Sequence, residues 1–233
     1  MDPGTSRNST LGQLQRLLLD ARMEGAAPFG PTAQAFERER DQFVHSSHDG
    51  PDRLHFVTEG LVAVLAQAPD GIAEAGLVGP AGLVEYQAVL GTSATRTVAV
   101  ALTSVRGVQV PRSAVLQAVQ RSAVLRRELF DYAARRIAET EQLCVCAARH
   151  SIERRLARWL LQASRLLGHK PVEITHQQFA SLFGVRRASV TTSLHLLEGE
   201  MAIRCWRGRI EIRDPARLEA LSCGCEAPRA QTG

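Results

Sequence analysis

The stretch of the chain that decides the fold lies between Thr175 and Ile212 and reads THQQFASLFGVRRASVTTSLHLLEGEMAIRCWRGRIEI. Thr175 and Gln178 have the spacing of a capping box, in which each side chain satisfies a backbone donor at the start of a helix. Gly184 is expected to close that helix, because a left-handed residue at a helix end costs little only for glycine. The pattern therefore predicts a short helix that begins at His176 and ends at Gly184.

A second helix is predicted from about Arg187 to Glu198, with Val190, Leu194 and Leu197 on its inner face. Its outer face is small and polar, and it presents Arg187, Ala188, Thr191, Thr192 and His195. Two short helices joined by a tight turn with glycine form a helix-turn-helix. Such an outer face suits the major groove of DNA, because bulky side chains would keep the helix away from the base edges.

A hairpin rich in arginine follows the second helix. Ala202 to Cys205 and Arg209 to Ile212 are predicted as two strands around the turn Trp206-Arg207-Gly208. Arg204, Arg207 and Arg209 gather on this hairpin, where they would meet phosphates beside the groove. Asp214 and Pro215 then supply an N-cap and a first-turn proline for a last helix. Helix-turn-helix and hairpin together indicate a winged helix.

The charge of the chain is concentrated in the same region. Of the 233 residues, 149–233 contain 14 Lys and Arg against 8 Asp and Glu, whereas the preceding part contains 14 against 16. A basic C-terminal part is the electrostatic pattern of a nucleic-acid-binding domain. With 45% hydrophobic residues the whole chain is expected to be globular, and its length favours two domains.

The N-terminal part has the pattern of a small all-β domain. Between Arg53 and Val110 short runs of β-branched residues alternate with Gly, Pro and Asp clusters, which predicts an antiparallel barrel or roll. The next forty residues contain neither Gly nor Pro, so one long helix is predicted there. We therefore divide the chain into a sensory roll at 1–111, a long helix at 112–149 and a DNA-binding domain at 150–233.

The long helix carries a heptad-like seam at steps of three and four residues, and its members are Phe130, Ala133, Ile137, Thr140 and Cys144. Such a seam is expected either to pack on the roll of its own chain or to form the interface of a coiled-coil dimer. The residues alone leave both alternatives open.

These features together resemble the Crp/Fnr type of transcription regulator. The resemblance is strongest over the helix-turn-helix and wing, and it is weaker over GLVAVLAQAPDGIAEAGLVGPAGLVEYQAVLG at residues 60–91. It implies an α+β fold that consists of an N-terminal antiparallel β-roll like the cyclic-nucleotide-binding domain, a long dimerisation helix and a C-terminal winged helix-turn-helix. It also favours the homodimer among the alternatives for the seam.

The resemblance assigns roles to residues around the second helix. Arg187 stands where the family reads guanine, and Ala188, Thr191 and Thr192 complete the base-reading set, although Ala188 and Thr192 depart from the acidic residue and the arginine that many members use. The phosphate contacts implied are Arg186, Ser189, Thr175, Arg204, Arg207 and Arg209. The expected partners are double-stranded DNA on a pseudo-palindromic operator, a second copy of the chain and RNA polymerase.

The effector of the roll is left open by the sequence. Family members that bind cyclic nucleotides use a Gly-Glu pair and a later Arg-Ser or Arg-Thr pair, and this chain has Arg96-Thr97 but Glu85 after valine. Half of that pattern is present, so we expect no cyclic nucleotide and assign Glu85, Arg96 and Thr97 only as a weak effector site. Haem remains an alternative, because His45, His48 and His55 lie near the roll. A redox effector also remains an alternative.

Five cysteines, all after residue 143, do not form a disulfide framework. Cys144 and Cys146 point to different faces of a helix, so packing is favoured over a redox pair. Cys223 and Cys225 have no second ligand pair nearby in the sequence except Cys205, which makes a metal site a weak hypothesis, and none is assigned.

Other classes of protein have little support. The sequence shows no Gly-rich phosphate loop, no HExxH and no G-x-S-x-G, so no enzyme is expected. The main alternative is a ligand-binding interaction module whose winged helix contacts protein rather than DNA. The first apolar stretch is interrupted by charges and lacks a cleavage site, so we expect no membrane association and a cytoplasmic location.

Overall fold

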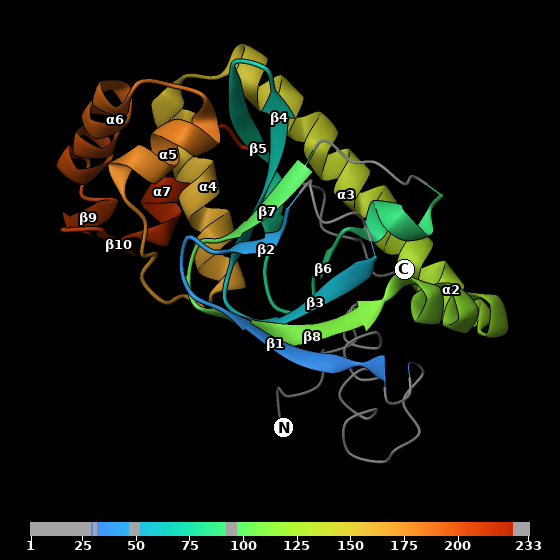
Figure 1. The fold of residues 1–233 in the computed structure, drawn as a ribbon. Helices are drawn as coiled ribbons and strands as arrows, with labels where there is room; N and C mark the ends of the chain where they lie inside the picture. Colours follow the sequence, from blue (N-terminus) through green and yellow to red (C-terminus); the bar gives the residue numbers. More distant parts are fainter. Residues whose placement is uncertain (1–28, 30–31, 47–51, 92–96, 226–233) are drawn as a thin grey trace, which may run out of the picture.

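The N-terminal half folds into a roll of two antiparallel sheets (Figure 1). One sheet has the order β1 (Gln34–Arg38), β8 (Val105–Pro111), β3 (Arg53–Glu59) and β6 (Leu83–Val84). The other has the order β2 (Phe43–His45), β7 (Thr97–Ala101), β4 (Val62–Ala68) and β5 (Gly71–Val78), and a short 3₁₀ helix, η2 (Tyr86–Val89), follows β6. This computed structural model describes residues 29, 32–46, 52–91 and 97–225.

The predicted roll is confirmed, and its β4–β5 hairpin shows why the sequence folds this way. Val62 pairs with Val78 and Ala68 with Gly71, so the turn is made by Pro69 and Asp70. Strands β1, β2 and β6 were not predicted, because two of them have only three and two residues and the third alternates polar side chains around Phe36.

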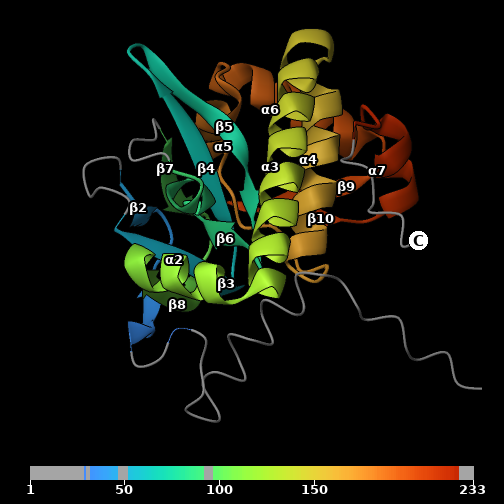
Figure 2. The same ribbon diagram turned by 90° about the vertical axis from the view of Figure 1, so that its right-hand side faces the viewer.

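The helices begin where the roll ends. They are α2 (Arg112–Arg121), α3 (Ala123–Arg149), α4 (Ile152–Leu166), α5 (His176–Phe183), α6 (Arg187–Gly199) and α7 (Pro215–Leu221), with strands β9 (Ile203–Trp206) and β10 (Arg209–Ile212) between α6 and α7. α3 stands between the roll and the pair α4 and α7 (Figure 2). No helix in the described part of the chain is both long and apolar enough to cross a bilayer.

The single long helix predicted for 112–149 is wrong in one respect, since the chain breaks at Ser122 into α2 and α3. The Ser122 hydroxyl accepts a hydrogen bond from the Leu125 amide at 3.2 Å and so caps α3. A serine can end one helix and start the next without glycine or proline, because its side chain replaces a lost backbone partner.

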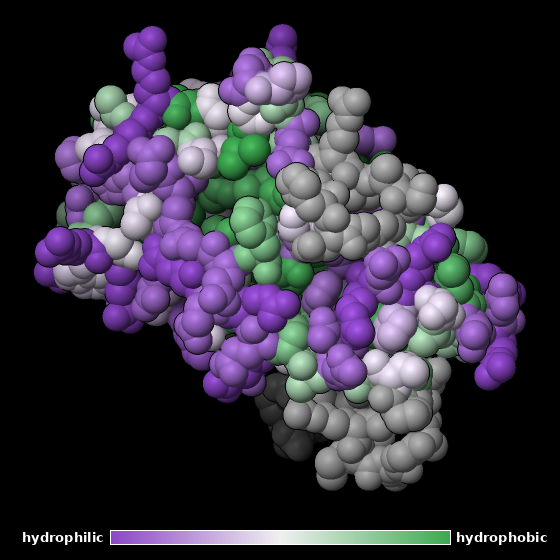
Figure 3. All heavy atoms as spheres, viewed as in Figure 1, coloured by the Kyte–Doolittle hydropathy of each residue, from purple (hydrophilic) through white to green (hydrophobic). Residues whose placement is uncertain are grey.

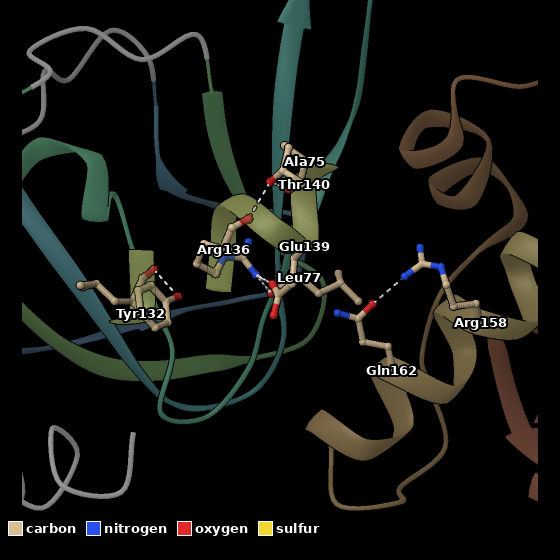
Figure 4. A network of polar contacts seen from close by, with 9 residues as sticks. Ala75, Leu77, Tyr132, Arg136, Glu139, Thr140, Arg158 and Gln162 are labelled. Carbon is tan, nitrogen blue, oxygen red and sulfur yellow. Dashed lines mark hydrogen bonds and ion pairs between the residues drawn. The ribbon is translucent and has the colours of Figure 1, made fainter. Parts of the chain in front are cut away.

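One face of α3 is fixed to the roll by polar side chains one turn apart (Figure 4). The Tyr132 hydroxyl donates to the Leu83 carbonyl at 2.8 Å, and Arg136 Nη1 donates to the Leu77 carbonyl at 2.7 Å. Arg136 reaches this position because Gly76 has no side chain, since a Cβ there would lie 2.4 Å from Arg136 Nη2. These contacts hold the helix against β5 and β6.

The predicted seam divides between the two faces of α3. Phe130, Ile137 and Cys144, spaced by seven residues, are exposed. Ala133, in contrast, is buried against its own chain, and the Thr140 hydroxyl donates to the Ala75 carbonyl at 3.1 Å. We therefore remove Ala133 and Thr140 from the seam, because the step of three rotates them toward the roll.

The roll and the C-terminal helices share one apolar core. Trp159 of α4 and Phe179 of α5 are fully buried, with their rings edge to face at 4.8 Å. They belong to the same cluster as roll residues Leu61, Leu65 and Leu77. The C-terminal part is therefore docked on the roll through α4 and α5.

A buried carboxyl group lies at this junction. Glu74 of β5 is half-buried as a residue, but its Oε1 atom has no access to solvent. Burial raises the pKa of the Glu74 carboxyl from 4.5 to about 7. The positive charge of Arg158 and the nearby indole of Trp159 lower this pKa, but burial has the larger effect. Near neutral pH this group therefore changes charge inside the junction.

The raised pKa predicts that the junction loses stability as the pH rises. The protonated carboxyl is favoured by folding, so its contribution to the free energy of unfolding is present below pH 4.5 and is lost as the pH rises to about 7. We expect the wild type to lose up to about 3 kcal/mol relative to Glu74→Gln between about pH 5 and about pH 8. Urea unfolding followed by tryptophan fluorescence would measure this difference.

Glu37→Gln is the matched control, because Glu37 is an exposed glutamate of β1 on the opposite sheet. It should keep the pH dependence of the wild type. If Glu74→Gln kept it as well, the buried carboxyl would not be its source.

Candidate nucleic-acid interface

The predicted start and end of α5 are both confirmed. Gln178 N donates to the Thr175 hydroxyl at 3.1 Å, and Gln178 Oε1 accepts from Thr175 N at 2.9 Å, which completes the capping box. Gly184 has a φ of 62° and ends the helix. Phe179 and Phe183 anchor α5 in the core, so its first turn is held at the surface with Thr175 exposed.

The recognition helix predicted from Arg187 is α6. Val190, Leu194 and Leu197 are buried, and Arg186, Arg187, Ala188, Thr192 and His195 are exposed. Arg186 is the N-cap and its side chain makes no capping bond, although its carbonyl accepts a hydrogen bond from the Ser189 amide at 3.0 Å. No side chain therefore caps the positive end of α6 among the described residues. An exposed helix N-terminus with two arginines attracts phosphate.

Two of the sequence-assigned side chains on α6 are less accessible than expected. Thr191 is half-buried, and its hydroxyl donates to the Arg187 carbonyl at 3.1 Å and lies 2.9 Å from His176 Nδ1 of α5. Ser189 is also half-buried. Thr191 therefore joins the two helices, whereas His195, which the same helical periodicity puts on this face, is exposed.

Positive charge gathers around the start of α6. Burial lowers the pKa of His176, and the charges of Arg187 and His195 lower it further. Arg187 and His195 therefore lie close enough to His176 to interact with it electrostatically, although both belong to α6 and His176 belongs to α5. The field here favours a negatively charged ligand.

The predicted wing is the hairpin β9–β10. Arg209 pairs with Trp206 and Arg204 with Glu211, and Gly208 has a φ of 72° in the turn. The Arg204 guanidinium lies 5.1 Å from the centre of the Trp206 ring, an arrangement that orients the charge. Arg204, Arg207 and Arg209 are all exposed.

The wing is held in a fixed position relative to α6. Glu198 Oε1 of α6 accepts from the Cys205 amide at 2.9 Å, and Ile203 and Ile210 are buried beneath the hairpin. Val172 extends the hairpin by pairing with Ile210 through two backbone hydrogen bonds of 2.8 Å. The surface over α6 and the hairpin is mostly hydrophilic and lies away from the roll (Figures 1 and 3).

A cavity of about 390 Å³ lies between the roll and α3. Most of its lining is apolar, and the polar lining includes His45, Glu85, Thr97, Arg136 and Thr140. Two residues of the exposed α3 stripe, Ile137 and Cys144, also line it, so the cavity adjoins that stripe. Of the weak effector set, Glu85 and Thr97 line the cavity and Arg96 lies outside the described residues.

The carboxylate of Glu85 is already engaged inside the protein. His45 Nδ1 pairs with one of its oxygens and His55 Nδ1 lies 2.9 Å from the other, and all three residues are buried. Glu85 adopts a left-handed backbone with φ of 64° to enter this network. Each of its two oxygens therefore lies against a histidine of the roll. His48 lies outside the described residues.

A loop of the roll contacts the helix-turn-helix directly. Arg40 Nη2 donates to Gln178 Oε1 at 2.7 Å, and Gln178 Nε2 donates to Asp41 Oδ1 at 2.5 Å. These residues are 138 and 137 positions apart, and no local pattern in the sequence could have paired them. The loop therefore covers the first turn of α5, beside Thr175.

Profiles of two known domains match this chain, and together they cover more than half of it. A cyclic nucleotide-binding domain matches residues 36–122, and a Crp-like helix-turn-helix domain matches residues 154–221. The cyclic AMP receptor protein of Thermus thermophilus is 28% identical over 149 residues, which are 64% of this chain and 68% of that protein.

Solved structures show the same fold. FixK2 from Bradyrhizobium japonicum superposes with a TM-score of 0.70 at 18% identity, over 82% of this chain and 98% of that one. A CRP-family transcriptional regulator of Thermus thermophilus superposes with a TM-score of 0.69 at 21% identity, over 80% and 96%. Both domain matches and the shared fold lead to one assignment: the chain belongs to the Crp/Fnr family of transcription regulators.

Proposed function

We propose that this regulator works as a homodimer that reads a pseudo-palindromic DNA site through α6 and responds to a small molecule bound beside α3. The observation that carries the proposal is the exposed face of α6, which is led by Arg187. The β9–β10 hairpin lies beside α6 (Figure 1), and its three arginines are exposed. A regulator of this kind acts on the chromosome, so we place it in the cytoplasm with RNA polymerase as a further partner.

Base reading is assigned to Arg187, Ala188, Thr192 and His195. The guanidinium fork of Arg187 can donate two hydrogen bonds to O6 and N7 of guanine. Arg186, Thr175 and the wing arginines are assigned to phosphates, which set the register of the protein on the duplex without reading sequence. Ser189 is retained in that set only through its position on the first turn of α6.

The dimer is proposed to form along the exposed stripe Phe130, Ile137 and Cys144. Phe130 is 53% exposed and Ile137 is 51% exposed, and large apolar side chains that gather on one exposed helix face mark an interaction surface. Two copies related by a two-fold axis along this stripe would have to present their recognition helices about 34 Å apart to enter successive major grooves.

The cavity is proposed to hold the effector. Its volume of about 390 Å³ is within the range of small-molecule sites, and its wall includes Ile137 and Cys144 of the dimer stripe. A ligand there would touch both the roll and α3. His45, which lines the cavity, ends strand β2, and Arg40 and Asp41 lie just before that strand and contact α5. One short segment of the chain therefore connects the proposed ligand site with the helix-turn-helix.

Arg187→Ala should abolish sequence selection by the protein. We expect a loss of about 1–3 kcal/mol, or about 5- to 150-fold, on the preferred site, because a bidentate contact to guanine is removed. Arg186→Ala should instead weaken binding to all sequences and reduce its salt dependence. Sequencing of genomic fragments selected by each protein at physiological salt would measure both effects.

Arg187→Lys is the matched control for charge, since it keeps the cation and loses the fork. It should retain general affinity and lose selectivity. If wild type and Arg187→Ala selected the same symmetric motif, α6 would not read DNA through Arg187 as proposed.

Phe130→Glu should shift the protein from dimer to monomer, because it places a charge in an apolar interface. Analytical ultracentrifugation over a concentration series would give the change, which we expect to be at least tenfold in the dissociation constant. Leu196→Glu is the control, since Leu196 is 56% exposed on α6 and outside the stripe. If the dimer tolerated Phe130→Glu and dissociated with Leu196→Glu, the interface would lie on α6 and not on α3.

Asp41→Asn should strengthen DNA binding. The Asp41 carboxylate accepts a hydrogen bond from Gln178 in the first turn of α5 and so holds α5 to the loop. It also lies close to the proposed phosphate contact of Thr175, where its negative charge would repel the DNA phosphates. We expect roughly three- to tenfold tighter binding, most evident at low salt. Fluorescence anisotropy with the selected site would measure it, and Asp52→Asn, next to α2, is the charge-matched control. Weaker binding by Asp41→Asn would mean that the loop supports the DNA-bound state.

A further inference from the structure

Three cysteines from two distant segments meet behind the winged helix. Cys146 lies in the last turn of α3, and Cys223 and Cys225 follow α7. Their sulfur atoms all lie within 4.8 Å of one another. His150, which caps the C-terminal end of α3, places its Nε2 atom 3.7 Å from the sulfur of Cys225.

Two of the separations in this cluster match those around a single tetrahedral ion. Zinc–sulfur bonds of about 2.3 Å at tetrahedral angles hold neighbouring sulfurs about 3.8 Å apart, and a zinc–nitrogen bond of about 2.0 Å gives a sulfur-to-nitrogen distance of about 3.5 Å. The Cys146 and Cys223 sulfurs are 3.8 Å apart, and the Cys225 to His150 distance is 3.7 Å. An iron–sulfur cluster would hold the sulfurs farther apart, because several atoms separate its ligands.

The backbone around the cysteines is shaped to present them. Gly224 has a φ of 66°, and its amide donates to the Ser222 hydroxyl at 3.2 Å, so the chain turns tightly between Cys223 and Cys225. This is the one position in the segment where glycine is required by the backbone. The turn directs both sulfur atoms toward Cys146, which is almost fully buried.

The surroundings complement the charge that such a site would carry. Three thiolates and one divalent cation leave one net negative charge, and Arg155 and Arg158 of α4 lie close enough to interact electrostatically with Cys146. Arg154 contacts the Ser222 carbonyl at 3.4 Å through two guanidinium nitrogens and so steadies the segment. The Nδ1 atom of His150 is buried without a hydrogen-bond partner among the described residues.

We propose that Cys146, Cys223 and Cys225 bind one thiophilic divalent cation of the zinc class, and that His150, whose Nε2 atom lies 3.7 Å from the Cys225 sulfur, supplies the fourth ligand. The site lacks a second cysteine pair in the sequence, and the fold supplies Cys146 and His150 in its place. The ion would join the end of α3 to the chain after α7 across the junction of α3 and α4. If the proposed function holds, the ion would thereby fix the DNA-binding part relative to the dimerisation helix.

The test is the binding of metal by purified full-length protein that has been reduced and stripped with chelator. Zinc is added in competition with a chromophoric chelator, and cobalt is then substituted to give the absorption of a tetrahedral thiolate complex. We expect one ion per chain in the wild type and at least tenfold weaker binding in Cys223→Ser. His150→Gln should keep a sulfur-to-cobalt band of altered shape.

Cys144→Ser and Cys205→Ser are the matched controls, because neither of these cysteines belongs to the cluster. Both should bind one ion as the wild type does. Circular dichroism of Cys223→Ser and Cys225→Ser would show that the loss of metal is not a loss of fold.

Two outcomes would overturn the proposal. One is zinc binding that Cys223→Ser and Cys225→Ser both leave unchanged. The other is a wild type that binds neither zinc nor cobalt after reduction. Neither outcome bears on the selection of DNA by Arg187, so the site and the proposed function can fail separately.

Discussion

The burial of Trp159 between the roll and α5 is the contact on which the arrangement of the molecule depends. Its ring fills the junction against Phe179 and shares a cluster with Leu61 and Leu77 of the roll. A fully buried tryptophan contributes several kcal/mol, more than any of the polar contacts nearby. Because α5 and α4 are fixed by this core, the exposed face of α6 has one orientation relative to the roll in this structure.

α3 connects the two ends of the molecule because its faces have different tasks. Tyr132 and Arg136 hold one face to the roll, while Phe130 and Ile137 leave the other uncovered. The cavity opens where the two faces meet, so its occupant would contact the element that also carries the proposed dimer interface. Because α3 is one helix of 27 residues, it joins this region to the far end, where Cys146 and the junction with α4 lie.

The DNA-binding half could be predicted closely from the sequence because its signals are local. The Thr175 and Gln178 capping box, the glycine at 184 and the Asp214-Pro215 start each depend on neighbours within four residues. Contacts between distant segments gave no such signal. The pairing of His45 and His55 with Glu85, and the meeting of Cys146 with Cys223, arise only when the roll closes and α7 packs on α4. The seam on α3 shows the same limit. Helical periodicity predicts one stripe for Phe130, Ala133 and Ile137. The position of the roll then decides which side of that stripe is exposed to solvent.

The strength of the junction limits how the proposed switch can work. Moving a two-state equilibrium from 1:99 to 99:1 requires about 5.5 kcal/mol of differential binding. The contacts of Gln178 with Arg40 and Asp41 supply roughly 1–3 kcal/mol in total, because partly exposed hydrogen bonds are individually weak. Release of the loop alone is therefore too small to reverse the equilibrium. An effector bound in the proposed site would therefore have to change the packing of α3 as well, and Ile137 and Thr140 of α3 line the cavity where it would do so.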